Sequence, residues 1–131
     1  MVFVDTSAWF AYFLPIDAAH SKVRDCIASN SQPLVTTDYC VDETLTLLMA
    51  RGEVRRALDA GQAFFHQNLT RVHFVAADQV HRAWILFQQR AHAGWSFTDC
   101  TSKIVIDDLQ IRTAFALDEH FRQFGNVTVV P

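Results

Sequence analysis

The chain has 131 residues, half of them hydrophobic, which is enough for one globular domain covering residues 1–131. Its net charge of −3 counts against a protein that binds nucleic acid by charge alone, because such proteins usually carry an excess of basic residues to neutralise phosphate. It is compatible with a protein whose acidic residues recruit cations. Three cysteines without a CxxC spacing indicate neither a disulfide framework nor a zinc site. Because no signal-peptide pattern and no apolar run of bilayer length occur, we expect a cytoplasmic protein outside the membrane.

Short apolar runs alternate with helical patterns along the whole chain. In its first half we expect a strand at 2–4, helices at 6–13 and 20–30, a strand at 34–36, and helices at 37–51 and 53–68, separated by Gly52. In its second half we expect a strand at 72–75, a helix at 78–91, a loop at 92–97, a helix at 98–107, a strand at 113–117, a short helix at 120–124 and a strand at 127–130. This alternation predicts an α/β fold, a three-layer α/β/α sandwich around a central, mainly parallel sheet.

Carboxylates follow two of the predicted strands. Asp5 comes directly after the first strand, and Asp118 comes directly after the strand at 113–117. Ligands of open parallel sheets bind at the carboxyl ends of the strands, where the strand order reverses. Glu43 lies about a turn into the predicted helix at 37–51, and Asp99 lies at the start of the predicted helix at 98–107. Both are further candidates for the same edge.

Each of these acids has a structural explanation when it is taken alone. Asp5 can cap a helix, Glu43 can lie on a solvated helix face, and Asp118 can hold a turn. Asp99 ends the sequence Ser96-Phe97-Thr98-Asp99, which matches a capping box. Four acids that converge would instead repel one another, and a divalent cation such as Mg²⁺ or Mn²⁺ would remove that repulsion. Such a metal can activate water and orient a phosphate, so the sequence favours phosphodiester hydrolysis.

Four blocks of the sequence, in order, resemble the motifs of PIN-domain nucleases, especially the VapC-type toxins of bacterial toxin–antitoxin pairs. They are Val4-Asp5-Thr6-Ser7-Ala8-Trp9, the stretch from Thr36 to Thr44 that contains Glu43, Ser96-Phe97-Thr98-Asp99-Cys100, and Ala116-Leu117-Asp118-Glu119-His120-Phe121. The blocks cover essentially the whole chain, and their spacings are similar to those of the family.

The resemblance implies a Mg²⁺- or Mn²⁺-dependent endoribonuclease that acts on RNA, is neutralised by a cognate antitoxin and forms a homodimer. It makes Asp5 and Asp99 the principal metal ligands. Glu43 would complete the site or position the attacking water, and Asp118 would serve a second metal or a bound water. Ser7 and Thr98 would support the acids by hydrogen bonding, whereas we expect His120 to pack or to hold its turn.

Two other interpretations are open at this point. The chain could be a catalytically inactive PIN-fold interaction module, although such modules generally lose acids that are present here. It could also be a metal-dependent phosphoryl-transfer or phospho-receiver domain, but Ser7 stands where a phosphatase of that kind has a second Asp. Four arginines could line an RNA path or belong to solvated helix faces: Arg51, Arg55, Arg56 and Arg90.

Overall fold

The structure is a computed structural model that describes residues 1–131, and it confirms the predicted α/β/α sandwich. Its strands are β1 (Val2–Val4), β2 (Leu34–Thr37), β3 (Arg71–His73), β4 (Thr113–Phe115) and β5 (Thr128–Val130). Its α-helices are α1 (Thr6–Phe13), α2 (His20–Ser29), α3 (Asp38–Ala50), α4 (Val54–Phe65), α5 (Ala77–Arg90) and α6 (Phe97–Asp108). Two short 3₁₀ helices, η1 (Ala91–Ala93) and η2 (Glu119–Gln123), complete the chain.

The five strands form one sheet in the order β3-β2-β1-β4-β5, and every neighbouring pair is parallel. From β1 the chain builds outward through β2 and β3, then returns to the other side of β1 with β4 and β5. The strand order therefore reverses between β1 and β4. This is the position at which open α/β sheets bind their ligands.

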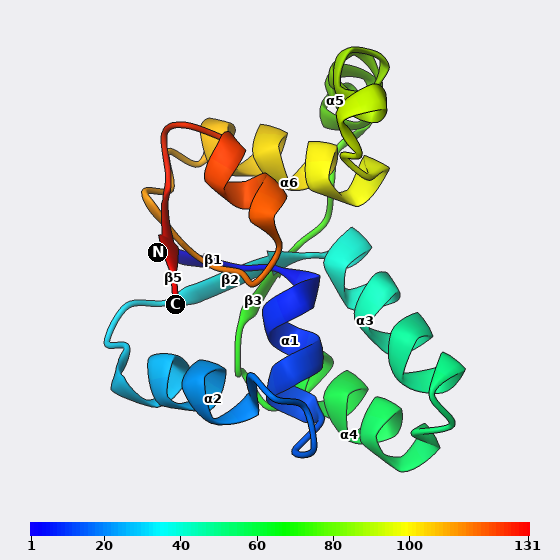
Figure 1. The fold of residues 1–131 in the computed structure, drawn as a ribbon, viewed down its shortest axis with the longest axis vertical. Helices are drawn as coiled ribbons and strands as arrows, with labels where there is room; N and C mark the ends of the chain where they lie inside the picture. Colours follow the sequence, from blue (N-terminus) through cyan, green and yellow to red (C-terminus); the bar gives the residue numbers. More distant parts are fainter.

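The sheet is covered on both faces, and successive strand residues alternate between two hydrophobic clusters. Val2 and Val4 pack with α1, α3 and α4, whereas Phe3 between them packs with α6 and η2. Figure 1 shows the two layers, with α5, α6 and η2 above the strands and α1, α2 and α4 below them. Both faces of β1 are buried, which explains why this strand is a continuous apolar run.

Local capping residues determine where several helices begin. The Asp5 side chain accepts from the backbone N–H of Ser7 at the start of α1, and Thr37 accepts from Cys40 at the start of α3. Ser96 accepts from the backbone N–H of Asp99 at the start of α6. The caps by Asp5 and Ser96 are expected from the sequence, since Asp, Ser and Thr oxygens satisfy the free N–H groups of a first helical turn.

Three elements end two or more residues earlier than the sequence predicts, and one of them is the strand expected at 72–75, which ends at His73. The helix expected at 53–68 stops at Phe65, and Asn68 adopts a left-handed backbone with φ of 53°. The strand expected at 113–117 ends at Phe115, because the backbone N–H groups of Leu117 and Asp118 turn toward Ser7. That turn, rather than a longer strand, brings Asp118 into the site described below. No helix is both long and apolar enough to cross a bilayer.

Candidate active site

A small pocket of about 290 Å³ lies at the carboxyl ends of the central strands. Its lining contains all four acids named in the sequence analysis: Asp5, Glu43, Asp99 and Asp118. Thr6, Ser7, Leu47, Gly94, Ser96 and His120 complete the lining. A larger hollow of about 680 Å³ at the amino ends of β4 and β5 contains only one carboxylate, Asp107, so the grouping of acids rather than size identifies the candidate site.

Asp5 is held by its neighbour Ser7. The Ser7 hydroxyl donates to Asp5 Oδ2 over 2.6 Å, and the Ser7 backbone N–H donates to the same oxygen over 3.1 Å. The side chain is nevertheless buried, and that desolvation raises its pKa from 3.8 to about 7, with the charges of Asp99 and Asp118 adding to the rise. A nearby cation would therefore strongly stabilise the ionised form of the Asp5 carboxylate.

Asp99 is held by the capping box of α6. Its Oδ2 accepts from the backbone N–H of Ser96 over 2.8 Å, while Ser96 Oγ accepts from the Asp99 backbone N–H over 3.0 Å. Burial raises the pKa of Asp99, and the charge of Asp118 acts in the same direction. The expected support from Thr98 is absent, because Thr98 lies outside the pocket lining and its side chain bonds none of the acids. Ser96 has that role instead, since the residue that closes a capping box lies three positions before the acid.

Asp118 is placed by Ser7, which is far away in the sequence, and by its near neighbour His120. The Ser7 hydroxyl accepts from the backbone N–H of Leu117 at 2.9 Å and of Asp118 at 3.3 Å, so one side chain ties α1 to the turn after β4. The Asp118 carboxylate then accepts from the backbone N–H of His120 at 2.9 Å and caps η2. Ser7 thus supports Asp5 and Asp118 together, which extends its expected role.

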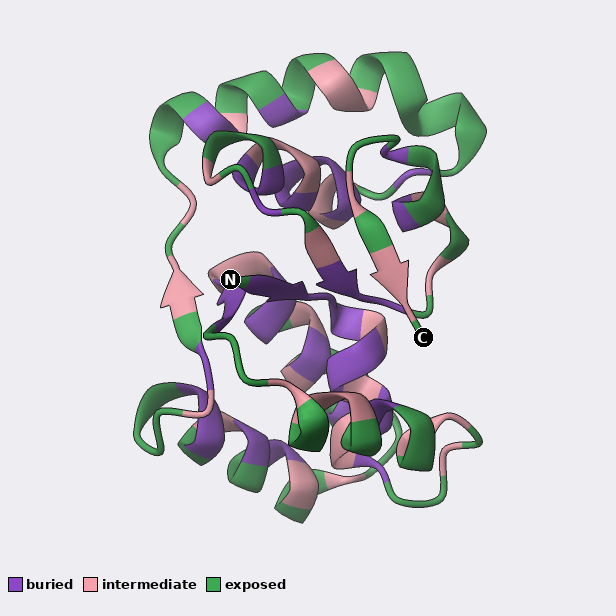
Figure 2. Ribbon diagram, turned by 90° about the vertical axis from the view of Figure 1, so that its left-hand side faces the viewer, coloured by how far each residue is buried: buried purple, intermediate pink, exposed green.

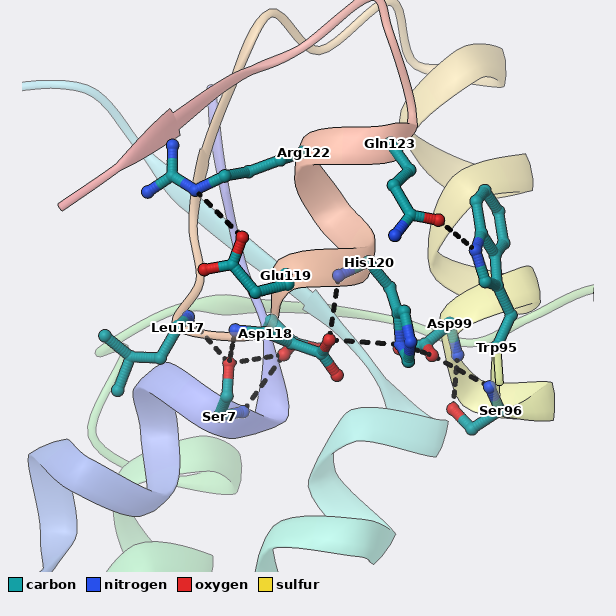
Figure 3. Close-up of polar contacts among 11 residues, drawn as sticks. Ser7, Trp95, Ser96, Asp99, Leu117, Asp118, Glu119, His120, Arg122 and Gln123 are labelled. Carbon is teal, nitrogen blue, oxygen red and sulfur yellow. Dashed lines mark hydrogen bonds and ion pairs between the residues drawn. The ribbon is translucent and has the colours of Figure 1, made fainter. Parts of the chain in front are cut away.

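His120 corrects an expectation, because its side chain belongs to the acid cluster rather than only to packing. Its Nδ1 lies 3.1 Å from Asp99 Oδ2 and 3.1 Å from Asp118 Oδ1 (Figure 3). One ligand atom from each of Asp99, Asp118 and His120 can be chosen so that all three lie within 4.8 Å of one another. A sequence signal existed, since His120 comes two residues after Asp118 in a short helix, but without the structure it could not be separated from a packing histidine.

Two loop residues, Gly94 and Trp95, pack around the imidazole of His120. Gly94 has φ of +88°, and a Cβ at this position would lie 3.4 Å from His120 Nε2. The neighbouring Trp95 is buried against the same ring with a centroid distance of 6.5 Å, and its indole N–H donates to Gln123 at 2.9 Å (Figure 3). The loop before α6 therefore fits closely around His120.

Glu43 and Thr6 complete the polar wall. Glu43 lies on α3 and is half-buried, with no ion pair to any basic side chain. The Thr6 hydroxyl is buried, lines the pocket and has no hydrogen-bond partner in the protein. A buried hydroxyl without a partner costs free energy, and a water in the pocket does not reach this oxygen, because it has almost no accessible surface. The carboxylate oxygens of the pocket and one imidazole nitrogen are a donor set that fits a hydrated divalent cation.

Comparison with known proteins assigns this arrangement to a family. No protein-family model matches the chain. The chain is 35% identical over 131 residues to the 23S rRNA-specific endonuclease VapC20 of Mycobacterium tuberculosis, a match that covers 100% of this chain and 99% of that protein. It is 28% identical over 139 residues to ribonuclease VapC26 of the same organism, with 98% of each chain covered.

Solved structures of related proteins share the fold of this chain. The crystal structure of VapC20 from M. tuberculosis, described as a sarcin–ricin loop cleaving toxin, superimposes with a TM-score of 0.92 at 34% identity over 100% of both chains. FitAcB from Neisseria gonorrhoeae matches with a TM-score of 0.72 at 12% identity, over 100% of this chain and 97% of that one, and supports the fold alone. The chain is more than 30% identical to VapC20 over its full length, and its acids are grouped where the strand order of the sheet reverses. The chain therefore belongs to the VapC family of PIN-domain endoribonuclease toxins.

Proposed function

We propose that this endoribonuclease hydrolyses RNA with a divalent metal held by the acid pocket, and that Asp5, Glu43, Asp99 and Asp118 are its catalytic residues. The observation that supports the proposal is the convergence of these four side chains in one pocket from four separate segments of the chain. Burial is the main cause of the raised pKa of Asp5 and Asp99, and the charge of the neighbouring Asp118 adds to the rise in both. A cation is the partner that such a group lacks within the protein itself.

Mg²⁺ or Mn²⁺ is the metal that the donor set fits best. Asp99, Asp118 and His120 offer three ligand atoms that lie close together, and Asp5 faces the same pocket. Hard carboxylate oxygens suit both ions, whereas an imidazole nitrogen favours Mn²⁺ over Mg²⁺. When bound, such an ion supplies an activated water and neutralises charge on the phosphate.

The protein groups have separable roles in this scheme. Asp5 and Asp99 are fixed by Ser7 and Ser96, so their carboxylates are oriented before any ligand binds. Glu43 is more accessible and free of partners, which suits it to orient the attacking water and accept its proton.

A loop of ribosomal RNA is the substrate class that we propose. The support comes from the relative that matches over the full length, which is named a 23S rRNA-specific endonuclease and described as cleaving the sarcin–ricin loop. Exposed loops are the usual targets of sequence-specific RNA recognition, because their bases are accessible.

A cognate antitoxin protein is the partner that family membership suggests, and we place it on α4. Val54, Leu58 and Phe65 lie about one turn or two turns apart along this helix and are each at least half exposed. An apolar stripe of this kind suits an amphipathic helix from a partner. Leu58→Glu should then abolish neutralisation by the antitoxin without changing RNA cleavage by the free enzyme.

We also propose a homodimer, which light scattering of the purified protein would test.

Cleavage of purified ribosomal RNA with Mn²⁺, with EDTA and with the variant Asp99→Asn tests the proposed function. We expect cutting that requires both the metal and Asp99. Asp42→Asn is the matched control, since Asp42 is the exposed neighbour of Glu43 and lies outside the pocket. Cutting that survives EDTA or Asp99→Asn would contradict the proposed site, and a folded wild type that cuts no RNA would support an inactive module.

A further inference from the structure

Two arginines outside the acid pocket differ from the other basic residues of the chain. Of the 11 lysines and arginines, six pair with a carboxylate: Arg24, Arg55, Arg56, Arg82, Lys103 and Arg122. The five without such a partner are Lys22, Arg51, Arg71, Arg90 and Arg112. Among these five, only Arg51 and Arg90 hold their guanidinium over an aromatic ring.

Arg51 lies on a line of residues that begins in the pocket. Glu43 and Leu47 line the pocket from α3, and Arg51 follows at the same four-residue interval, so all three share one face of the helix. Two turns of helix separate Glu43 from Arg51, which is about 12 Å along the axis. The Arg51 guanidinium lies 5.3 Å from the ring centroid of Phe10, which in turn lies one turn after Ser7 on α1.

Arg90 lies beside the opposite part of the pocket lining. Its guanidinium is 5.4 Å from the ring centroid of Trp95. Its backbone carbonyl accepts from the backbone N–H of Trp95 at 3.3 Å. Trp95 is held between the pocket residues Gly94 and Ser96 and is tied to Gln123. The guanidinium of Arg90 is thereby anchored on the tryptophan that supports His120, yet the residue itself is exposed.

We propose that Arg51 and Arg90 bind the RNA phosphates on the two sides of the bond that is cut, one beyond the α3 wall of the pocket and one beyond the loop before α6. This proposal rests on the proposed function of the acid pocket. A polyanion that enters an acidic pocket needs cations at its margins, and guanidinium groups suit phosphate because they can donate two parallel hydrogen bonds. Stacking on a ring orients each guanidinium and leaves its N–H groups free, because no carboxylate of the protein uses them.

The same contacts separate these residues from the other two arginines considered in the sequence analysis. Arg55 pairs with Asp59 at 3.3 Å and Arg56 pairs with Glu53 at 3.2 Å, so both belong to solvated faces of α4. Arg71 and Arg112 carry no carboxylate partner, but they line hollows at the amino ends of the strands, across the sheet from the acids. Arg71 and Arg112 therefore serve as matched controls, with the same side chain and exposure but the wrong location.

The test measures binding and cleavage of a labelled hairpin RNA that carries the sarcin–ricin loop. Binding is measured by fluorescence anisotropy in an Asp99→Asn background, so that the RNA stays intact. We expect Arg51→Gln and Arg90→Gln each to raise Kd, and KM in the otherwise wild-type enzyme, by about fivefold to tenfold, with kcat changed by less than about twofold. Each should also lower the slope of log Kd against log salt by about 0.7, the value for one phosphate contact on a single strand.

Controls distinguish a phosphate contact from a structural role or a general charge effect. Arg112→Gln and Arg71→Gln should leave Kd, KM and the salt slope unchanged, and Arg90→Lys should fall between wild type and Arg90→Gln because it keeps the charge but not the planar group. Thermal unfolding of all variants should be similar. Unchanged Kd and salt slope in Arg51→Gln and Arg90→Gln, or an equal loss in Arg112→Gln, would overturn the proposal. If the wild type neither binds nor cuts this hairpin or whole ribosomal RNA, the proposed function fails and this inference fails with it.

Discussion

The buried carboxylate of Asp5 should make the metal-free protein less stable as the pH rises. Its pKa is about 7 in the folded protein and 3.8 when unperturbed, so between these values the folded state keeps a proton that the unfolded chain releases. The free energy of unfolding therefore falls as the pH rises from about 4 to about 7, and it levels off above that. Nearly the whole penalty, about 4 kcal/mol, is present at pH 8, whereas about 2 kcal/mol is present at pH 5.

Asp5→Asn isolates this effect, because asparagine stays neutral and its amide oxygen can still accept from the Ser7 hydroxyl and N–H. In urea unfolding with EDTA, we expect the variant to be more stable than the wild type, by a margin that grows by about 2 kcal/mol from pH 5 to pH 8. Comparing the two proteins at each pH cancels the titration of groups that they share. Saturating Mn²⁺ should reverse the order at pH 8, since a bound cation stabilises the ionised carboxylate of the wild type alone. A margin that is equal at pH 5 and pH 8 would refute the reasoning.

Three further substitutions test the supports of the site and of the core. Ser7→Ala removes the acceptor of Leu117 and Asp118 and a donor to Asp5, so it should cost about 1–3 kcal/mol in urea unfolding and should weaken the stabilisation by Mn²⁺. Gly94→Ala places a Cβ near His120 in a left-handed backbone; we expect about 1 kcal/mol of strain and a lower Mn²⁺ affinity by calorimetry, and unchanged binding would contradict the role given to His120. Phe64→Ala empties a buried position that contacts Trp9 and Phe13 and should cost about 3–5 kcal/mol with no specific effect on metal affinity at temperatures where the variant is folded.

The sequence predicted the sheet and the grouping of acids because both depend on local patterns. A buried parallel strand is a continuous apolar run: Val2–Val4 consists of such a run, Leu34–Thr37 begins with one, and Thr113–Phe115 ends with one. Once strands and helices alternate, the carboxyl ends of parallel strands must lie at one edge, so an acid that follows a strand reaches that edge. The same logic predicted the caps by Asp5 and Ser96, which involve residues only two or three positions apart.

What could not be predicted depends on contacts between distant segments. Ser7 accepts from Leu117, 110 positions away, and Trp95 donates to Gln123, 28 positions away. The sequence predicts that His120 packs or holds its turn, because a histidine in a short helix gives no local sign that two carboxylates will face it. The four candidate arginines were also equivalent in sequence, and only their partners separate Arg55 and Arg56 from Arg51 and Arg90.

The two kinds of contact also divide the site in how it forms. Asp5 and Asp99 are oriented by caps within their own helices, so each is placed as soon as its helix begins on the sheet. Asp118 and His120 reach the pocket only when β4 pairs with β1 and the following turn closes on Ser7. Figure 2 shows the segment after β4 as mostly partly buried or exposed, in contrast to the buried centre of the sheet. The half of the site that contributes Asp118 and His120 therefore depends on a segment that is less buried than the central strands, and a cation that joins it to Asp99 would stabilise that segment in particular.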